Sequence, residues 1–228
     1  MIKHVLLDLD DTIFDFHMAE AVAVRDTLQA FGVCVTDAIV ARYSAINDAQ
    51  WKRLELGELT REQVKRLRFE LLFDELGLPC DAERVRTYYE DRLAVGHYFL
   101  PGAEEMLSTL SKRYDLYLVS NGTTAVQNGR LASAGIAPLF KKIFLSEAIG
   151  AVKPQKEFFD YCFSKIKDFS RDDAIIFGDS LTSDIQGGIN AGIKTCWFNP
   201  AAKPCRADIT PDYEVHTLDA FTALVDRL

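Results

Sequence analysis

Short apolar segments alternate with helical patterns through most of this chain, and this alternation constrains its fold more than any other feature. Apolar runs typical of buried strands occur at residues 2–9, 115–122, 142–146, 174–180 and 194–198. Helical patterns separate the last four runs, near residues 124–134, 155–165 and 183–191. Strands that alternate with helices predict an α/β fold, here a doubly wound, mainly parallel, Rossmann-like sheet with right-handed crossovers.

A block of helical patterns interrupts the alternation after the first predicted strand. Between residues 17 and 93, apolar residues recur at helical spacing and no strand pattern occurs. Thr60 and Gln63 form a capping box that opens one of these helices, and Asp81 can cap the next. We therefore expect two domains, an α/β core and an inserted all-α helical cap. The expected boundaries are 1–15 together with 96–228 for the core, and 16–95 for the cap.

The composition restricts the partners of the protein. Of its 228 residues, 48% are hydrophobic, which is enough to bury one good core and a smaller second one. The formal net charge of -8 argues against binding to polymeric nucleic acid or to an anionic membrane through bulk electrostatics. Five cysteines without C-x-x-C spacing favour neither a zinc site nor a disulfide framework. With no leader pattern and no apolar run of bilayer length, we expect a cytoplasmic protein, monomeric or homodimeric.

The stretch "HVLLDLDDT" ends an apolar run in three acidic residues, Asp8, Asp10 and Asp11. Three carboxylates next to a buried strand repel one another, and a bound cation would remove the repulsion. In doubly wound sheets, ligands bind at the carboxyl ends of the strands. Further polar residues follow the predicted strands at corresponding places: Thr12, Ser120, Asn121, Gly122, Lys153, Asp179, Ser180 and Asp184.

Each of these groups also has an ordinary structural interpretation. The acidic residues with Thr12 could form a turn with a helix cap, and residues 120–122 could be a simple exit from a strand. Lys153 could be a solvated residue before a proline that begins a helix, and Asp179 could be a helix N-cap. Taken singly, several of these residues would be called structural. Their joint order along an α/β chain favours a functional site.

That order resembles the haloacid dehalogenase-like hydrolase superfamily. The matching motifs are D-x-D-x-T at residues 8–12, Ser120, Lys153 followed by Pro154, and G-D-x-x-x-x-D at residues 178–184. The helical block between the first two motifs resembles the small α-helical cap of that superfamily. Members with Asp two residues after the nucleophile are typically phosphatases, whereas the dehalogenases lack that residue. The presence of Asp10 therefore implies a phosphatase.

Phosphate monoester hydrolysis explains these residue types independently. It needs a nucleophile, a proton donor for the leaving alcohol, and positive charge. We expect Asp8 to be the nucleophile that forms an aspartyl-phosphate. In an extended strand Asp8 and Asp10 project to the same side, so that Asp10 can act as general acid and then as general base. Ser120, Lys153 and the backbone N–H of Asn121, next to Gly122, would bind the phosphate oxygens.

Mg²⁺ is the cation that we expect to offset the repulsion among these carboxylates. This hard cation prefers oxygen ligands, and we expect it at the Asp8 carboxylate, the Asp10 backbone carbonyl and the Asp179 carboxylate. By the resemblance, Asp184 supports the metal or binds it through water.

A narrower resemblance concerns the substrate. The chain is similar to the bacterial cytosolic pyrimidine 5'-nucleotidases in the segments "LDDTIFDF", "INDAQW", "GELTREQV", "VSNGT", "KPQKEFFDY", "GDSLTSDIQGG" and "CWFNP". This resemblance implies that nucleoside 5'-monophosphates are the substrates. Phe16 and Trp51 could stack on the base and Asn47 could bind its edge. Core packing explains Phe16 equally well, and a tryptophan such as Trp51 more often packs in a core than contacts a ligand.

Two alternatives stay open. A sugar-phosphate or phosphoglycolate phosphatase would use the same core with a different cap lining. A phospho-accepting signalling domain would combine a similar set of residues but would hold its acyl-phosphate without turnover.

Overall fold

The computed structural model describes all residues from 1 to 228, and the chain divides into two compact units. We call them the core unit and the helical unit. The core unit contains Met1–Asp15, Phe99–Thr124 and Ala134–Leu228. The helical unit contains Phe16–Tyr98 and, in addition, Ala125–Ser133. The insertion expected at residues 16–95 is therefore accompanied in the helical unit by part of a helix from later in the chain.

The core unit is built on a sheet of six strands that are all parallel to their neighbours, in the order β3-β2-β1-β4-β5-β6. This confirms the predicted doubly wound α/β fold. The strands are β1 (His4–Leu7), β2 (Asp115–Ser120), β3 (Lys142–Leu145), β4 (Ala174–Gly178), β5 (Lys194–Phe198) and β6 (Tyr213–Val215). The last of these, β6, was not predicted, because three residues are too few to show a strand period.

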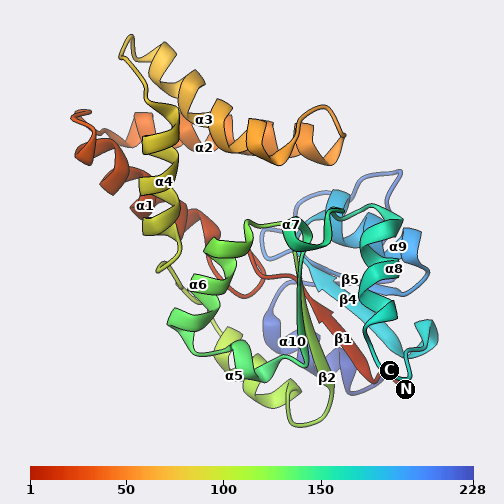
Figure 1. Ribbon diagram of the computed structural model, residues 1–228. Helices are drawn as coiled ribbons and strands as arrows, with labels where there is room; N and C mark the ends of the chain where they lie inside the picture. Colours follow the sequence, from red (N-terminus) through yellow and green to blue (C-terminus); the bar gives the residue numbers. More distant parts are fainter. The chain divides into compact units, whose positions relative to one another are not determined.

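Helices cover both faces of the sheet, which is why its central strands are almost entirely apolar. Helices α8 (Lys156–Ser164) and α9 (Gln186–Ala191) lie together on one face (Figure 1). There Phe158 and Phe159 pack with Leu6 and Ile176 in one buried cluster. On the opposite face, Phe221 stacks on Phe177 with ring centroids 3.8 Å apart. Phe221 belongs to α10 (Leu218–Val225), which contacts α5 (Ala103–Leu110).

The elements that follow β2, β3 and β4 in the chain include one longer helix and several short ones. Helix α6 (Thr124–Ala134) follows β2, and α7 (Ser146–Ile149) follows β3. Single helical turns are formed by η1 (Ala137–Leu139), η2 (Arg171–Asp173) and η3 (Leu181–Ile185). The turn η3 is π-helical, so that the helix predicted near residues 183–191 is a π-helical turn followed by α9.

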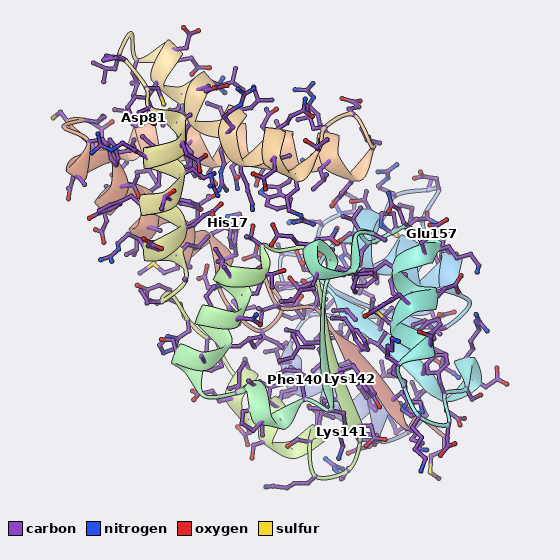
Figure 2. The ribbon with its side chains drawn as sticks, viewed as in Figure 1. His17, Asp81, Phe140, Lys141, Lys142 and Glu157 are labelled. Atoms are coloured by element: carbon purple, nitrogen blue, oxygen red, sulfur yellow. The ribbon has the colours of Figure 1, made fainter.

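The helical unit contains four long helices and no strand, as the sequence pattern predicts. They are α1 (Phe16–Ala30), α2 (Asp37–Glu55), α3 (Arg61–Glu75) and α4 (Ala82–Leu93). The capping box of Thr60 and Gln63 opens α3. Asp81, labelled in Figure 2, accepts a hydrogen bond from the Arg84 N–H at the start of α4. The aromatic rings of Tyr43, Phe69 and Tyr89 pack together in the core of this unit.

Two further sequence expectations concern the cysteines and membranes. All five cysteines are free thiols. None of the helices is long and apolar enough to cross a bilayer.

Candidate active site

The candidate site lies at the carboxyl ends of β1 and β4, the neighbouring strands at which the strand order of the sheet reverses. Asp8 follows the last residue of β1, and Asp179 follows the last residue of β4. The Asp8 N–H donates a hydrogen bond of 3.0 Å to the Phe177 carbonyl oxygen, which extends the pairing of the two strands. Parallel pairing thus places the two carboxylates side by side at one edge of the sheet.

A third carboxylate, that of Asp184, completes an acidic cluster. One carboxylate oxygen each from Asp8, Asp179 and Asp184 lie within 4.8 Å of one another. Asp184 comes from the π-helical turn η3, and its Oδ2 accepts a 3.2 Å hydrogen bond from the Ser180 N–H. A Cβ atom at position 178 would lie 2.3 Å from Asp184 Oδ2, so only glycine leaves room for this carboxylate. The G-D-x-x-x-x-D spacing therefore has a steric reason.

Lys153 connects two of these carboxylates from a fully buried position. Its Nζ donates hydrogen bonds of 2.6 Å to Asp8 Oδ1 and 2.6 Å to Asp184 Oδ1, and a third of 2.8 Å to the Val119 carbonyl oxygen. An ammonium group has three donors, and all three are therefore bound to the protein. In this arrangement Lys153 acts on a substrate through its charge and through the orientation of Asp8.

Asn121 holds the backbone of Lys153 in place. Its Oδ1 accepts a 2.8 Å hydrogen bond from the Lys153 N–H, and its Nδ2 donates one of 2.9 Å to the Lys153 carbonyl oxygen. Only the backbone N–H of Asn121 was predicted to have a role, toward substrate, and this function of its side chain was not predicted. A bond between loops that are distant in sequence leaves no local signal.

Burial and charge set the protonation of the cluster. Burial, with a smaller contribution from the charges of Asp184 and Asp10, raises the pKa of Asp8 to about 8 against the opposing charge of Lys153. Burial also raises the pKa of Asp179 well above its usual range, with the Asp8 and Asp184 carboxylates adding to it. The pKa of Lys153 is raised despite burial because Asp184 and Asp8 favour its charged form. The protein alone therefore supplies too little positive charge to hold the pKa values of Asp8 and Asp179 in the usual range of a carboxyl group.

The remaining residues predicted for the core site lie at the end of β2 and in the loops after β1 and β2. Thr12 Oγ1 accepts a 3.1 Å hydrogen bond from the N–H of Asp179. This bond connects the loop after β1 to a residue predicted to bind the metal. Ser120 is buried, and its Oγ accepts a 3.0 Å hydrogen bond from the Gly122 N–H. Asp10 forms an isolated backbone bridge with Phe14, and its charge acts on Asp8.

Phe16, Asn47 and Trp51 belong to the helical unit. Asn47 is fully buried there, and its Nδ2 donates a 2.8 Å hydrogen bond to Glu20 Oε1. Its Oδ1 accepts hydrogen bonds of 3.1 Å from Trp51 Nε1 and 3.1 Å from Arg68 Nη1. The side chain of Asn47 is thus engaged within its own unit, where it orients the indole of Trp51. No periodic or local sequence pattern indicates this buried polar network.

The donor set of the acidic cluster fits a hard divalent cation. Carboxylate oxygens are the ligands that Mg²⁺ prefers, and three of them converge here. Two of the carboxylates bind Lys153, whereas that of Asp179 receives no hydrogen bond from the protein. A partly buried carboxylate without a donor, next to two others, is a suitable ligand for such an ion.

Comparison with known proteins adds three findings. The model of the haloacid dehalogenase-like hydrolase family matches residues 5–198. The HAD-hydrolase YfnB of Bacillus subtilis is 42% identical over 217 residues, which cover 95% of this chain and 92% of YfnB. A crystal structure of YfnB, described as bound to magnesium and as revealing interdomain movement, matches with a TM-score of 0.94 and 40% identity over 99% of both chains.

The names of two further relatives state an enzymatic activity. The pyrimidine 5'-nucleotidase PynA of Streptococcus pneumoniae is 38% identical, and the match covers 99% of this chain and 95% of PynA. The pyrimidine 5'-nucleotidase YjjG of Escherichia coli is 28% identical, and the match covers 97% of this chain and 96% of YjjG.

Proposed function

Because this chain belongs to the haloacid dehalogenase-like hydrolase family, we propose that it is a Mg²⁺-dependent phosphatase that hydrolyses nucleoside 5'-monophosphates. The observation that carries the proposal is the cluster of Asp8, Asp179 and Asp184 joined to Lys153 at the carboxyl edge of the sheet. The names of PynA and YjjG support the choice of a pyrimidine nucleotide as substrate.

In the first step, a carboxylate oxygen of Asp8 attacks the phosphorus of the monoester. A bond forms between this oxygen and phosphorus while the bond from phosphorus to the ester oxygen breaks. Asp10 gives its proton to the departing ester oxygen, so that the nucleoside leaves as a neutral alcohol. The products of this step are the free nucleoside and an aspartyl-phosphate at Asp8.

In the second step, water hydrolyses the aspartyl-phosphate. Asp10, now ionised, accepts a proton from the water as its oxygen attacks phosphorus. The bond between phosphorus and Asp8 breaks, inorganic phosphate leaves, and the Asp8 carboxylate is restored. Asp10 is again protonated, so both residues return to their starting states.

The other residues of the site stabilise the charge on the transferring phosphoryl group. The Ser120 hydroxyl and the Asn121 N–H are the donors for its non-bridging oxygens, and the Gly122 N–H orients the Ser120 hydroxyl by donating to its Oγ. Lys153 keeps Asp8 oriented and contributes a fixed positive charge within a buried region, where charge acts strongly. The residues that would hold Mg²⁺ are Asp8, Asp179 and the Asp10 carbonyl, with Asp184 in support. Bound there, the ion would keep the carboxylates ionised and offset phosphoryl charge.

Substrate choice depends on the helical unit in this proposal. Trp51 is partly exposed, and its indole is held by Asn47. The guanidinium of Arg61 lies 5.4 Å from the centre of the Trp51 ring. An ordered indole is a suitable surface for stacking a pyrimidine base. The direct contacts with substrate assigned to Phe16 and Asn47 stay predictions.

Replacing Trp51 with Ala should reduce kcat/KM for a pyrimidine nucleotide by about tenfold, the size expected for the loss of one stacked base. It should leave kcat/KM for ribose 5-phosphate, which has no base, almost unchanged. Measuring both substrates with wild type and W51A separates stacking from a general effect on folding. An unchanged ratio between the two substrates would show that Trp51 does not contact the base.

The proposed function is tested by phosphate release from a panel of monoesters with Mg²⁺ and with EDTA. We expect Mg²⁺-dependent turnover that is fastest on pyrimidine nucleoside 5'-monophosphates. Higher kcat/KM on sugar phosphates or phosphoglycolate would assign the substrate to that class instead. Phosphorylation of one equivalent of protein without continued release would indicate a phospho-accepting signalling domain.

A further inference from the structure

The backbone of Asp179 is held from both sides by side chains of neighbouring segments. Its N–H donates a 3.1 Å hydrogen bond to Thr12 Oγ1, in the loop after β1. Its carbonyl oxygen accepts a 2.8 Å hydrogen bond from the indole Nε1 of Trp197, on β5. These two bonds fix the peptide planes before and after the Asp179 Cα atom. The direction of its Cα–Cβ bond, from which the carboxylate extends, is therefore set by the two neighbouring segments.

Trp197 is well placed to hold this carbonyl group rigidly. It pairs with Gly178 in the register of β4 and β5, one residue before Asp179. The side chain is only 3% exposed and packs with Ile185 and Ile209, and Leu181 adjoins this cluster. Ile185 and Leu181 belong to the turn η3 that carries Asp184. One indole therefore supports the segments of two of the three clustered carboxylates.

We infer that Trp197 is a positioning residue of the acidic cluster, whose indole N–H holds Asp179 in the orientation that binds a divalent cation. The inference rests on the proposed Mg²⁺ site and extends it to a side chain that contacts neither metal nor substrate. Loss of a residue that orients a metal ligand through a hydrogen bond typically lowers the metal affinity by a factor of about 10 to 100. The positioning role requires the N–H donor of the indole. A residue that only filled the core would not need a hydrogen-bond donor.

Removing the donor should weaken Mg²⁺ binding in the absence of any substrate. Isothermal titration calorimetry of the full chain should give a dissociation constant for W197F about tenfold or more above that of wild type. Trp51 provides the control, because its indole is also a hydrogen-bond donor, here to the Asn47 side chain, but lies in the helical unit. The W51F variant should bind Mg²⁺ within about twofold of wild type, as expected for a site without shared partners.

A second variant separates the hydrogen bond from packing. Since the chain contains two tryptophans, Trp197 is the only one left in W51F. Growth of a tryptophan auxotroph on β-(3-benzothienyl)alanine would replace Trp197 there with a residue of nearly the same shape, in which sulfur takes the place of the N–H. This protein should show the same weakened Mg²⁺ affinity as W197F while keeping its unfolding temperature close to that of W51F.

The outcomes distinguish this inference from the proposed function. Wild type that binds no Mg²⁺ would contradict the proposed metal site itself. Wild type that binds Mg²⁺, with equal affinity in W197F and in the benzothienyl protein, would overturn the positioning role while the proposed function stands. Normal affinity in the benzothienyl protein alone would assign the effect of W197F to packing and would also overturn it.

Discussion

Replacing Asp8 with Asn should lower kcat/KM for the best nucleotide substrate by at least about 10⁴-fold, or about 5.4 kcal/mol of transition-state stabilisation. The amide has nearly the shape of the carboxylate but cannot form the bond to phosphorus. It also removes one carboxylate, and with it one negative charge, from the acidic cluster at the end of β1. Steady-state phosphate release with saturating Mg²⁺ measures the effect.

The exposed carboxylate of Asp160 provides the matched control for this substitution. Asp160 lies on α8 and pairs with Lys156 at 2.5 Å, with 46% of its side chain exposed. The D160N variant should retain wild-type kcat/KM, because the residue lies on the solvent side of its helix. Circular dichroism should show that D8N is folded. Activity of folded D8N within tenfold of wild type would remove Asp8 from the role of nucleophile.

Replacing Lys153 with Ala should destabilise the core unit by about 3 to 5 kcal/mol in the absence of Mg²⁺, and it should impair catalysis as well. Lys153 is 1% exposed and is the hydrogen-bonded partner of both Asp8 and Asp184. Its loss leaves two carboxylates in a region where an unpaired charge is costly. Urea unfolding followed by circular dichroism, in the presence of EDTA, measures the loss.

The same surface pair on α8 provides the control. In K156A an exposed lysine loses its bond to Asp160, and exposed pairs contribute at most about 1 kcal/mol. A loss in K153A no larger than that in K156A would contradict the account of Lys153 as the charge that balances the cluster. Both variants should also be assayed for phosphate release, where only K153A should lose activity.

Much of the fold could be predicted because it depends on local patterns. Buried parallel strands require continuous apolar runs, and β1 and β4 could be predicted because each has such a run. Thr60 and Asp81 marked helix starts because caps are made by side chains close in sequence. By contrast, α10 is held by the stacking of Phe221 on Phe177, a contact between distant segments, and it was not predicted.

The site could be predicted only as far as its residues follow strands. Asp8 and Asp179 each follow a predicted strand, and the parallel pairing of these two strands, β1 and β4, brings the two residues together. The bonds from Asn121 to the Lys153 backbone and from Trp197 to Asp179 depend on the paths of loops, which no periodic pattern describes. The burial of Asn47 among Glu20 and Arg68 likewise depends on how three helices pack.

The stereochemistry at phosphorus tests most directly the central claim that Asp8 captures the phosphoryl group. A nucleoside phosphorothioate made chiral with oxygen isotopes would be hydrolysed by the Mg²⁺-loaded enzyme in water labelled with a third isotope. Two successive in-line displacements, first by Asp8 and then by water, predict overall retention of configuration in the thiophosphate released. Inversion would mean a single direct attack by water and would contradict the aspartyl-phosphate mechanism.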